Sequence, residues 1–176
     1  MPDRGSSDRP LTAPHCLAEV ERLLFVEAQH LDDKTWDAWA ELYHDDARFW
    51  VPSWLDEYEL VSDPDTQVSF IYHTSRAQLR ERIGRIQSRK SITALPLPRT
   101  LHMISNIVLS ERNELGVDAR SCWTTHVFDP RTRRQYLHFG TYEHLLVRTA
   151  EGYRIASKKI VIMNDCIPAV VDFYSI

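Results

Sequence analysis

Histidine, cysteine and acidic side chains are the residues of this chain that could hold a metal or move a proton. A Rieske-type iron–sulfur centre needs two Cys and two His in closely spaced pairs. The nearest match is Cys122-Trp-Thr-Thr-His126, and no second pair accompanies it. A mononuclear iron site needs two His and a carboxylate around one opening, but His138 and His144 are six positions apart on one expected strand. We therefore expect no metal site here.

The sequence also lacks the motifs that are typical of nucleotide binding and of nucleophilic catalysis. The chain has only five glycines, and their positions (5, 84, 116, 140 and 152) form neither a phosphate-binding loop nor a dinucleotide fingerprint. No Gly-x-Ser-x-Gly elbow is present. The three cysteines, Cys16, Cys122 and Cys166, are an odd number at wide spacing, so we expect buried or half-buried free thiols rather than a disulfide framework.

Acid–base chemistry in a cavity stays open as an alternative. Asp32 ends the first expected helix, and His102 and His126 lie on neighbouring expected strands, so an Asp–His pair could act on a small ring. The same groups could equally be core residues with satisfied hydrogen bonds. Four further side chains share strand parity and would face one side unless Gly140 forms a bulge: Tyr136, His138, Tyr142 and His144.

The elements that would position these residues change in type along the chain. Apolar residues at helical spacing predict a helix over residues 18–31, with Glu27 placed off its apolar stripe, and a shorter helix around Trp36 and Trp39. Short strands follow at 47–51 and 67–72, and Ser75 with Gln78 forms a capping box before a third helix. Period-2 patterns then predict four long antiparallel strands, at 100–111, 116–128, 134–149 and 153–164.

This order predicts an α+β fold in which a strongly curved antiparallel sheet packs on N-terminal helices and forms a cone. We expect a single cone-fold domain over residues 15–176, preceded by a mobile N-terminal tail over residues 1–14, which is rich in Pro, Gly and Ser. The length of 176 residues suits one domain that builds its own core.

Charge and hydropathy exclude two classes of partner. The net charge is −4, and the arginine-rich third helix carries no aromatic residue, so we expect no nucleic acid partner. The longest run without an acidic or basic residue, 100–110, is too short to span a membrane. The N-terminus lacks the apolar segment of a secretory signal, which predicts a cytoplasmic protein.

Four stretches, in order along the chain, resemble the beta (small) subunit of aromatic-ring-hydroxylating dioxygenases, especially the benzoate, toluate and anthranilate branch. They are LDDKTWDAWAELYHDDARFWVPSW (31–54), DPDTQVSFIYHTSRAQLRERIGRI (63–86), PRTLHMISNIVL (98–109) and KKIVIMNDCIPAVVDFYSI (158–176).

This resemblance implies the cone-shaped fold of the nuclear-transport-factor-2-like superfamily and a large alpha subunit as partner, with self-association as a trimer within α3β3. The alpha subunit would carry the Rieske 2Fe-2S cluster and the mononuclear iron, and NADH would supply electrons through a reductase. The complex would add O₂ across adjacent ring carbons of an aromatic carboxylate. No catalytic, cofactor-binding or metal residue is carried over to this chain, whose role would be structural.

Two expectations about individual residues follow. Trp50, Trp54 and Tyr58 flank a loop that we expect to contact the alpha subunit, and Arg99 and His102 could do the same, although packing within the chain explains each equally well. The alternative within the superfamily is a stand-alone enzyme similar to scytalone dehydratase or ketosteroid isomerase, which would use Asp32 with His102 or His126 in an open pocket.

Overall fold

The computed structural model describes residues 14–88, 95–113, 116–164, 167–168 and 170–176. Three helices, α1 (Pro14–Asp32), α2 (Trp36–Glu41) and α3 (Arg76–Gln87), lie on one side of a long, twisted sheet. A short 3-10 helix, η2 (Phe173–Ser175), follows the sheet near the C-terminus. Within the described ranges, none of the helices has the length and apolar character needed to cross a membrane.

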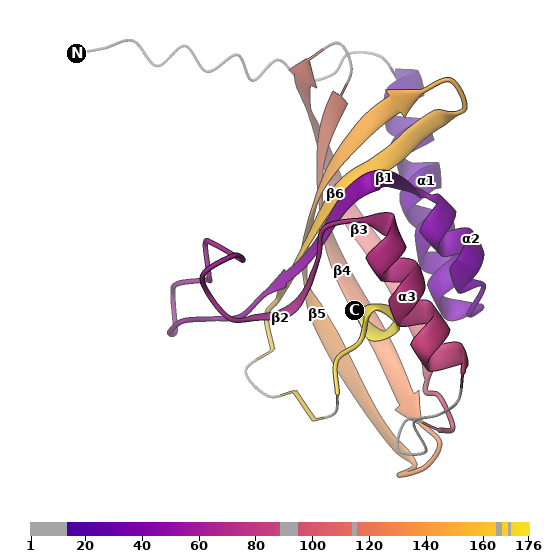
Figure 1. Ribbon diagram of the computed structural model, residues 1–176, viewed down its shortest axis with the longest axis vertical. Helices are drawn as coiled ribbons and strands as arrows, with labels where there is room; N and C mark the ends of the chain where they lie inside the picture. The colour runs from indigo at the N-terminus through magenta and orange to yellow at the C-terminus, as the bar shows by residue number, and fades with distance from the viewer. Residues whose placement is uncertain (1–13, 89–94, 114–115, 165–166, 169) are drawn as a thin grey trace.

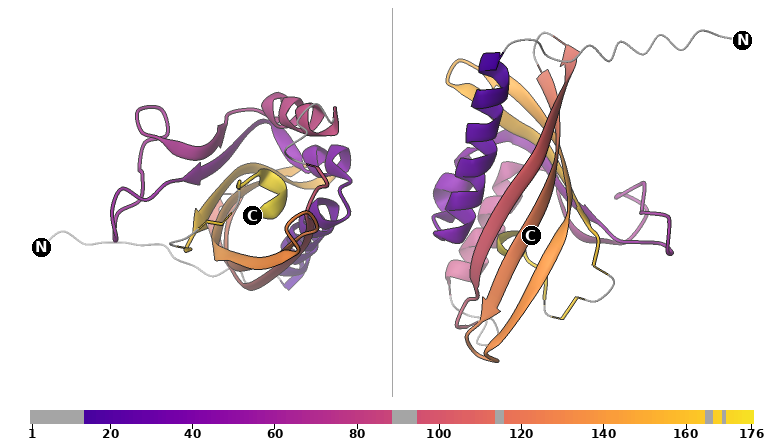
Figure 2. Two further views of the ribbon diagram at one scale, coloured as in Figure 1. Left: turned by 90° about the horizontal axis from the view of Figure 1, so that it is seen from below. Right: turned by 180° about the vertical axis from the view of Figure 1, so that it is seen from behind.

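The sheet has six strands in the order β2-β1-β6-β5-β4-β3. Their bounds are β1 (Tyr43–Pro52), β2 (Ser69–His73), β3 (Arg99–Asn113), β4 (Gly116–Asp129), β5 (Arg134–Thr149) and β6 (Gly152–Ile162). All neighbours pair antiparallel except β1 and β6, which run parallel. Seen from below, the sheet curls around the C-terminal segment and forms the expected cone (Figure 2).

Helix α1 ends with a turn that its sequence does not announce. Lys34 adopts a left-handed backbone conformation (φ 59°). The N–H of Thr35 then donates to the carbonyl of His30 at 3.0 Å, and that of Lys34 donates to Leu31 at 3.3 Å. These are the two bonds of a Schellman C-cap, with lysine where glycine is usual. The turn directs the chain into α2.

The caps of the other helices agree in part with the sequence. The side chain of Ser75 accepts from the N–H of Gln78 at the start of α3, as a capping box requires. The return bond goes one residue further back, because Gln78 Oε1 accepts from the N–H of Thr74 at 2.8 Å. At the start of α2, Thr35 makes no capping bond, and its hydroxyl lies 2.7 Å from His30 Nδ1.

The C-terminal segment completes the core inside the cone. Phe173 stacks on Trp39 with ring centroids 4.8 Å apart, and Tyr174 stacks on Trp36 at 5.5 Å. Ile176 is fully buried. Asp172 fixes the segment to α3, because its carboxylate accepts from Arg82 Nη2 at 2.5 Å and Arg82 Nε at 3.2 Å. The helices, the inner sheet face and the chain end therefore share one core.

The structure confirms the helices and the long strands, each within a few residues. Trp36 and Trp39 are core residues, as expected. Gly140 stays in register between Trp123 and Ile162, so the parity argument for the histidines of β5 holds. The parallel β1–β6 pairing was not predicted. The tail prediction falls almost wholly outside the described residues.

Two sequence expectations about burial are wrong. Cys122 is exposed, because its position on β4 points it to the face of the sheet away from the helices. Cys16 is half-buried, and Cys166 lies outside the described residues. Glu27, expected off the apolar stripe of α1, is completely buried.

Candidate functional site

The interior of the cone contains a buried charged network centred on Glu27. Its Oε1 accepts from Lys158 Nζ at 2.8 Å, from the hydroxyl of Tyr43 at 2.5 Å and from the indole N–H of Trp39 at 3.4 Å. His144 Nε2 lies 3.7 Å from Oε2. Elements α1, α2, β1, β5 and β6 each supply one of these side chains, so the network joins the helical layer to the sheet.

The charges in this network support one another. Burial alone would raise the pKa of Glu27, but the Lys158 ammonium and the His144 ring outweigh it and hold that pKa well below its usual range. Burial lowers the pKa of Lys158, which the contact with Glu27 opposes. Lys158 also lies 4.0 Å above the ring of Tyr142. We interpret the network as a buried ion pair that holds layers together.

A second carboxylate–histidine pair lies where α1 ends. Asp32 Oδ1 is 2.6 Å from His102 Nδ1, and Asp32 Oδ2 accepts from the backbone N–H of His102 at 2.9 Å. The Thr100 hydroxyl donates to Oδ1 at 2.9 Å. Burial raises the pKa of Asp32, but these bonds, chiefly the one from His102, lower it overall. Asp32 and His102 are thus together, as the enzyme alternative requires.

The structure separates the two histidines of the enzyme alternative. His126 is exposed on the opposite face of the sheet, because its neighbour Thr125, and not His126, pairs inward with His102 and His138. Aromatic side chains occupy part of the interior, with Trp123 and Tyr142 stacked at 5.1 Å and Phe173 against Trp39. Of the two pairs that the alternative allows, only Asp32–His102 is formed.

Metal ligands do not assemble in the part of the chain that the structure describes. No group of three His, Cys, Asp or Glu side chains there is placed to hold a metal ion. His138 and His144 both point into the cone and are both buried. Burial lowers the pKa of each, which favours the neutral ring. The neutral ring is the form that binds metals, but among the described residues no third ligand is grouped with these two side chains.

The sheet face away from the helices carries a groove of about 1020 Å³. Arg120, Glu143, Lys159 and Trp50 lie side by side in it on β4, β5, β6 and β1. Lys159 Nζ is 3.4 Å from a Glu143 oxygen and 5.5 Å from the centre of the Trp50 ring. Cross-strand pairs of opposite charge stabilise a sheet, and the row makes this end of the face polar.

The other end of the same face is apolar. Leu101 and Leu137 flank His126 in one row across β3, β4 and β5, and Met103 and Phe139 flank Thr124 in the next. We call the exposed apolar side chains here, 36% to 57% exposed, the outer patch; they are Leu101, Met103, Phe128, Leu137, Phe139 and Met163. Patches of this kind on a protein surface usually mark contacts with other proteins.

Residues 53–68, between β1 and β2, form an arm that projects from the sheet on the side away from the helices (Figure 1). Its own hydrogen bonds order it. The N–H of Val61 donates to the carbonyl of Ser53 at 2.9 Å. Asp56 accepts from the N–H groups of Tyr58 and Glu59, both at 2.8 Å, and these bonds lower its pKa. The arm is therefore an ordered projection that its own hydrogen bonds hold in shape.

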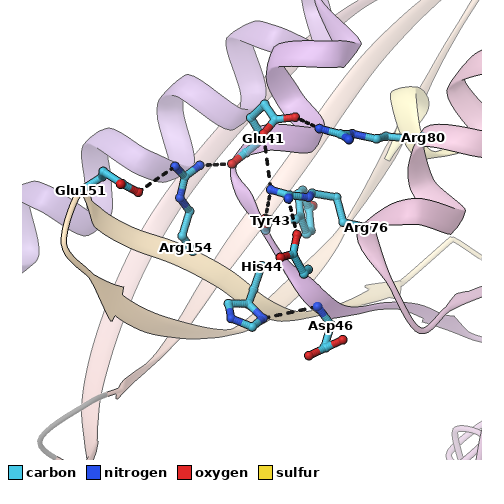
Figure 3. Close-up of polar contacts among 9 residues, drawn as sticks. Glu41, Tyr43, His44, Asp46, Arg76, Arg80, Glu151 and Arg154 are labelled. Carbon is cyan, nitrogen blue, oxygen red and sulfur yellow. Dashed lines mark hydrogen bonds and ion pairs between the residues drawn. The ribbon is translucent and has the colours of Figure 1, made fainter.

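The arginines of α3 are engaged in ion pairs. Arg76 and Arg80 both pair with Glu41 at the end of α2, and Arg76 also binds Asp45 (Figure 3). Arg154 of β6 donates to the backbone carbonyl of Glu41. The basic side of this helix is thus largely neutralised within the chain.

In the structure, the five residues predicted for a subunit interface lie in different environments. Tyr58 on the arm is 84% exposed, and Trp54 at the arm's base is 36% exposed and donates to the carbonyl of Ile162 at 2.7 Å. Trp50 is half-buried and donates to Ser69 at 2.9 Å. Arg99 is exposed, with its guanidinium 5.9 Å above the ring of Phe128. His102 is buried against Asp32 and does not reach the surface.

Sequence reasoning missed the buried Glu27–Lys158 pair. A signal was present, because Glu27 lies three residues after Leu24 and four before Leu31, on the stripe that helical spacing assigns to the core. The signal for Lys158 was weaker and consisted only of its place on the inward face of the last long strand. The arm was foreseen through Trp54 and Tyr58, whereas the outer patch was not foreseen.

Comparisons with known proteins find small subunits of dioxygenases. The 2-halobenzoate 1,2-dioxygenase small subunit of Burkholderia cepacia is 39% identical over 158 residues, covering 90% of this chain and 94% of that protein. The benzoate 1,2-dioxygenase beta subunit of Burkholderia mallei has a TM-score of 0.76 and 31% identity, with 91% of this chain and 97% of that chain covered.

A more distant structure shares the fold alone. It is an NTF2-like protein with a cystatin-like fold from Novosphingobium aromaticivorans, with a TM-score of 0.60 and 14% identity over 86% of this chain and 84% of that chain. The predicted cone fold is confirmed. The family model described as "Ring hydroxylating beta subunit" matches residues 26–169. The chain therefore belongs to the ring-hydroxylating dioxygenase beta subunit family.

Proposed function

We propose that this chain is the structural beta subunit of a Rieske non-haem iron dioxygenase that cis-dihydroxylates an aromatic carboxylate of the benzoate, toluate or anthranilate type. The observation that carries this proposal is the family match over residues 26–169. The relatives named for benzoate and 2-halobenzoate dioxygenases support the substrate class. The complex would act in the cytoplasm, in the catabolism of aromatic compounds.

The large alpha subunit would hold the Rieske 2Fe-2S cluster and the mononuclear iron, and a reductase would deliver electrons from NADH. The interior of this chain supports that division of labour. Its Glu27–His144 pair is fully buried, and the described residues contain no set of three metal ligands. We propose self-association as a trimer within α3β3, with Trp50, Trp54, Tyr58 and Arg99 in subunit contacts.

Reconstitution tests this function. The chain is co-expressed with the alpha subunit of a benzoate-type dioxygenase, purified through a tag on the alpha subunit, and supplied with reductase, NADH and either benzoate or anthranilate. We expect co-purification, O₂ uptake and a dihydroxylated product only when both subunits are present. The chain alone should give no product. Turnover by the isolated chain, or no association with the alpha subunit, would contradict the proposal.

The enzyme alternative receives its own control in the same assay. Asp32→Asn removes the charge of the buried pair and leaves the surface unchanged. If Asp32 serves structure alone, the folded variant complex should retain the wild-type turnover per iron. A selective loss of turnover at normal iron content and stability would instead give the Asp32–His102 pair a direct part in the chemistry.

A further inference from the structure

We propose that the arm of one copy docks on the outer patch of a second copy of this chain. The contact would produce the self-association proposed above, and the inference rests on that proposal. It assigns Tyr58 and Arg99, expected from the sequence to meet the alpha subunit, to the contact between copies. Arm and patch are different surfaces of one chain, so each copy offers one and needs the other.

The apolar groups of the two surfaces are complementary. The arm exposes Leu55 (51%), Tyr58 (84%) and Val68 (82%) to solvent. These are large apolar groups on a projection that extends away from its own sheet in both side views (Figures 1 and 2). The outer patch offers apolar side chains on β3 and β5, on both sides of His126 and Thr124, and Phe128 on β4. Docking would remove both sets from water, which is the main driving force of association.

The charges around the apolar groups are complementary as well. The arm contains five acidic residues and neither lysine nor arginine: Asp56, Glu57, Glu59, Asp63 and Asp65. The patch has a basic rim, which lies next to Phe128 and is made of Arg99 and the arginines of the β4–β5 hairpin. The hairpin arginines are Arg131, Arg133 and Arg134, and all four arginines are exposed. Opposite potentials on two surfaces select their mutual orientation and steer encounter.

Both surfaces are held in shape before they meet. Asp63 accepts from the N–H of Asp65 at 3.0 Å and from the Thr66 hydroxyl at 2.7 Å, which fixes the far part of the arm. On the rim, the one acidic residue is turned back into its own hairpin, where Asp129 accepts from the N–H of Arg131 at 2.8 Å. Preorganised surfaces lose less conformational entropy on binding.

Because the arm and the outer patch are different surfaces of each copy, the copies would associate head to tail. Such heterologous contacts close into rings when the rotation between neighbours permits it. Three copies would give the trimer proposed above, with each arm on the next patch. The alpha subunit would then bind a different part of the surface.

Charge reversal tests the contact in the full chain. The arm variant is Glu57→Lys/Glu59→Lys/Asp65→Lys, which spares the two aspartates that order the arm. The rim variant is Arg99→Glu/Arg133→Glu/Arg134→Glu. Sedimentation velocity at low salt should show a roughly 100-fold higher dissociation constant for either variant. A chain with all six changes should self-associate within about tenfold of wild type, because the charges match again.

A control variant and a mixture make the result specific. Asp33→Lys/Asp37→Lys/Glu81→Lys changes the same number of charges on the helical side and should self-associate like wild type. In an equimolar mixture of the two variants, the lysine arm faces the glutamate rim and the acidic arm faces the arginine rim, so unlike copies should associate although neither variant associates with itself. Far-UV circular dichroism and melting temperature confirm that each variant is folded.

Each outcome has one meaning. If wild type is a monomer both alone and with the alpha subunit, the proposed self-association is wrong. If wild type is oligomeric and the arm and rim variants stay so, self-association stands and the arm–patch contact is wrong. If the folded six-change chain remains a monomer, the contact is also wrong. If the variants keep their oligomeric state and lose the alpha subunit, the alpha subunit covers these surfaces, and the inference is overturned.

Discussion

At the scale of single residues, Gly140 marks the closest approach between β5 and β6. A Cβ atom there would meet the carbonyl oxygen of Val161 at 1.9 Å and Trp123 Nε1 at 3.3 Å. We expect Gly140→Ala to lower the free energy of unfolding by about 3 kcal/mol, because a backbone atom must move to admit the methyl group. Urea denaturation measures this effect.

Gly84 on α3 is the matched control. A Cβ atom there meets nothing within 4 Å. Since alanine is the better helix former, Gly84→Ala should raise the free energy of unfolding by up to about 1 kcal/mol. Equal effects of the two substitutions would show that close packing at position 140 is not what the sheet depends on.

The buried histidines make stability depend on pH. Burial lowers the pKa of His138 below its ordinary value of 6.5, so in acid the unfolded chain takes up the proton first. Stability is therefore complete above about pH 7 and is lost as pH falls through 6.5 toward the folded-state pKa. We expect the free energy of unfolding to fall between pH 7 and 5.

The variant His138→Gln isolates the contribution of that ring. It should be less stable at pH 7, because Gln packs less well, but its stability should change less between pH 7 and 5 than that of wild type. Urea titrations at several pH values compare the two slopes. Parallel slopes would mean that other groups, such as His144, carry the pH dependence.

At the scale of elements, the Glu27–Lys158 pair fastens α1 to β6. Lys158→Met should destabilise the chain by about 3–5 kcal/mol, because it leaves a buried carboxylate without its counter-ion. Glu27→Gln/Lys158→Met should cost clearly less than the sum of the two single changes, since it removes both charges. Additive losses in this double-mutant cycle would show that the pair is not coupled.

The elements that the sequence predicted well are those set by local pattern. Helix α3 follows from Ser75 and its apolar stripe, and β3 to β6 follow from alternation between short turns. The approach of Asp32 to His102 was foreseen because both elements were placed correctly. His126 was placed wrongly, since a strand residue and its neighbour point to opposite faces and only the register with Thr125 decides between them.

At the scale of the whole molecule, the C-terminal segment completes the core between the helices and the sheet. No local pattern indicates where a short terminal segment will pack. The arm–patch complementarity was equally hidden in the sequence. Its acidic and basic halves lie far apart along the chain, on the β1–β2 connection and the β4–β5 hairpin.

Phe173 provides the test of this filling role. It is 2% exposed and stacks on Trp39, so Phe173→Ala should reduce the free energy of unfolding by about 3–5 kcal/mol. Val170→Ala, at a side chain that is 85% exposed, should change it by less than about 0.5 kcal/mol. A small effect at position 173 would mean that the cone is stable without its filling.

The parallel pairing of β1 with β6 has a consequence for synthesis in the cell. Phe49 and Lys158 are partners, so the middle of the sheet joins a strand made early to one made almost last. Pairing between such distant segments is slow. The nascent chain must therefore wait on the ribosome with β1 paired to β2 alone and its other edge open, and co-translational contact with chaperones should be strongest in that interval.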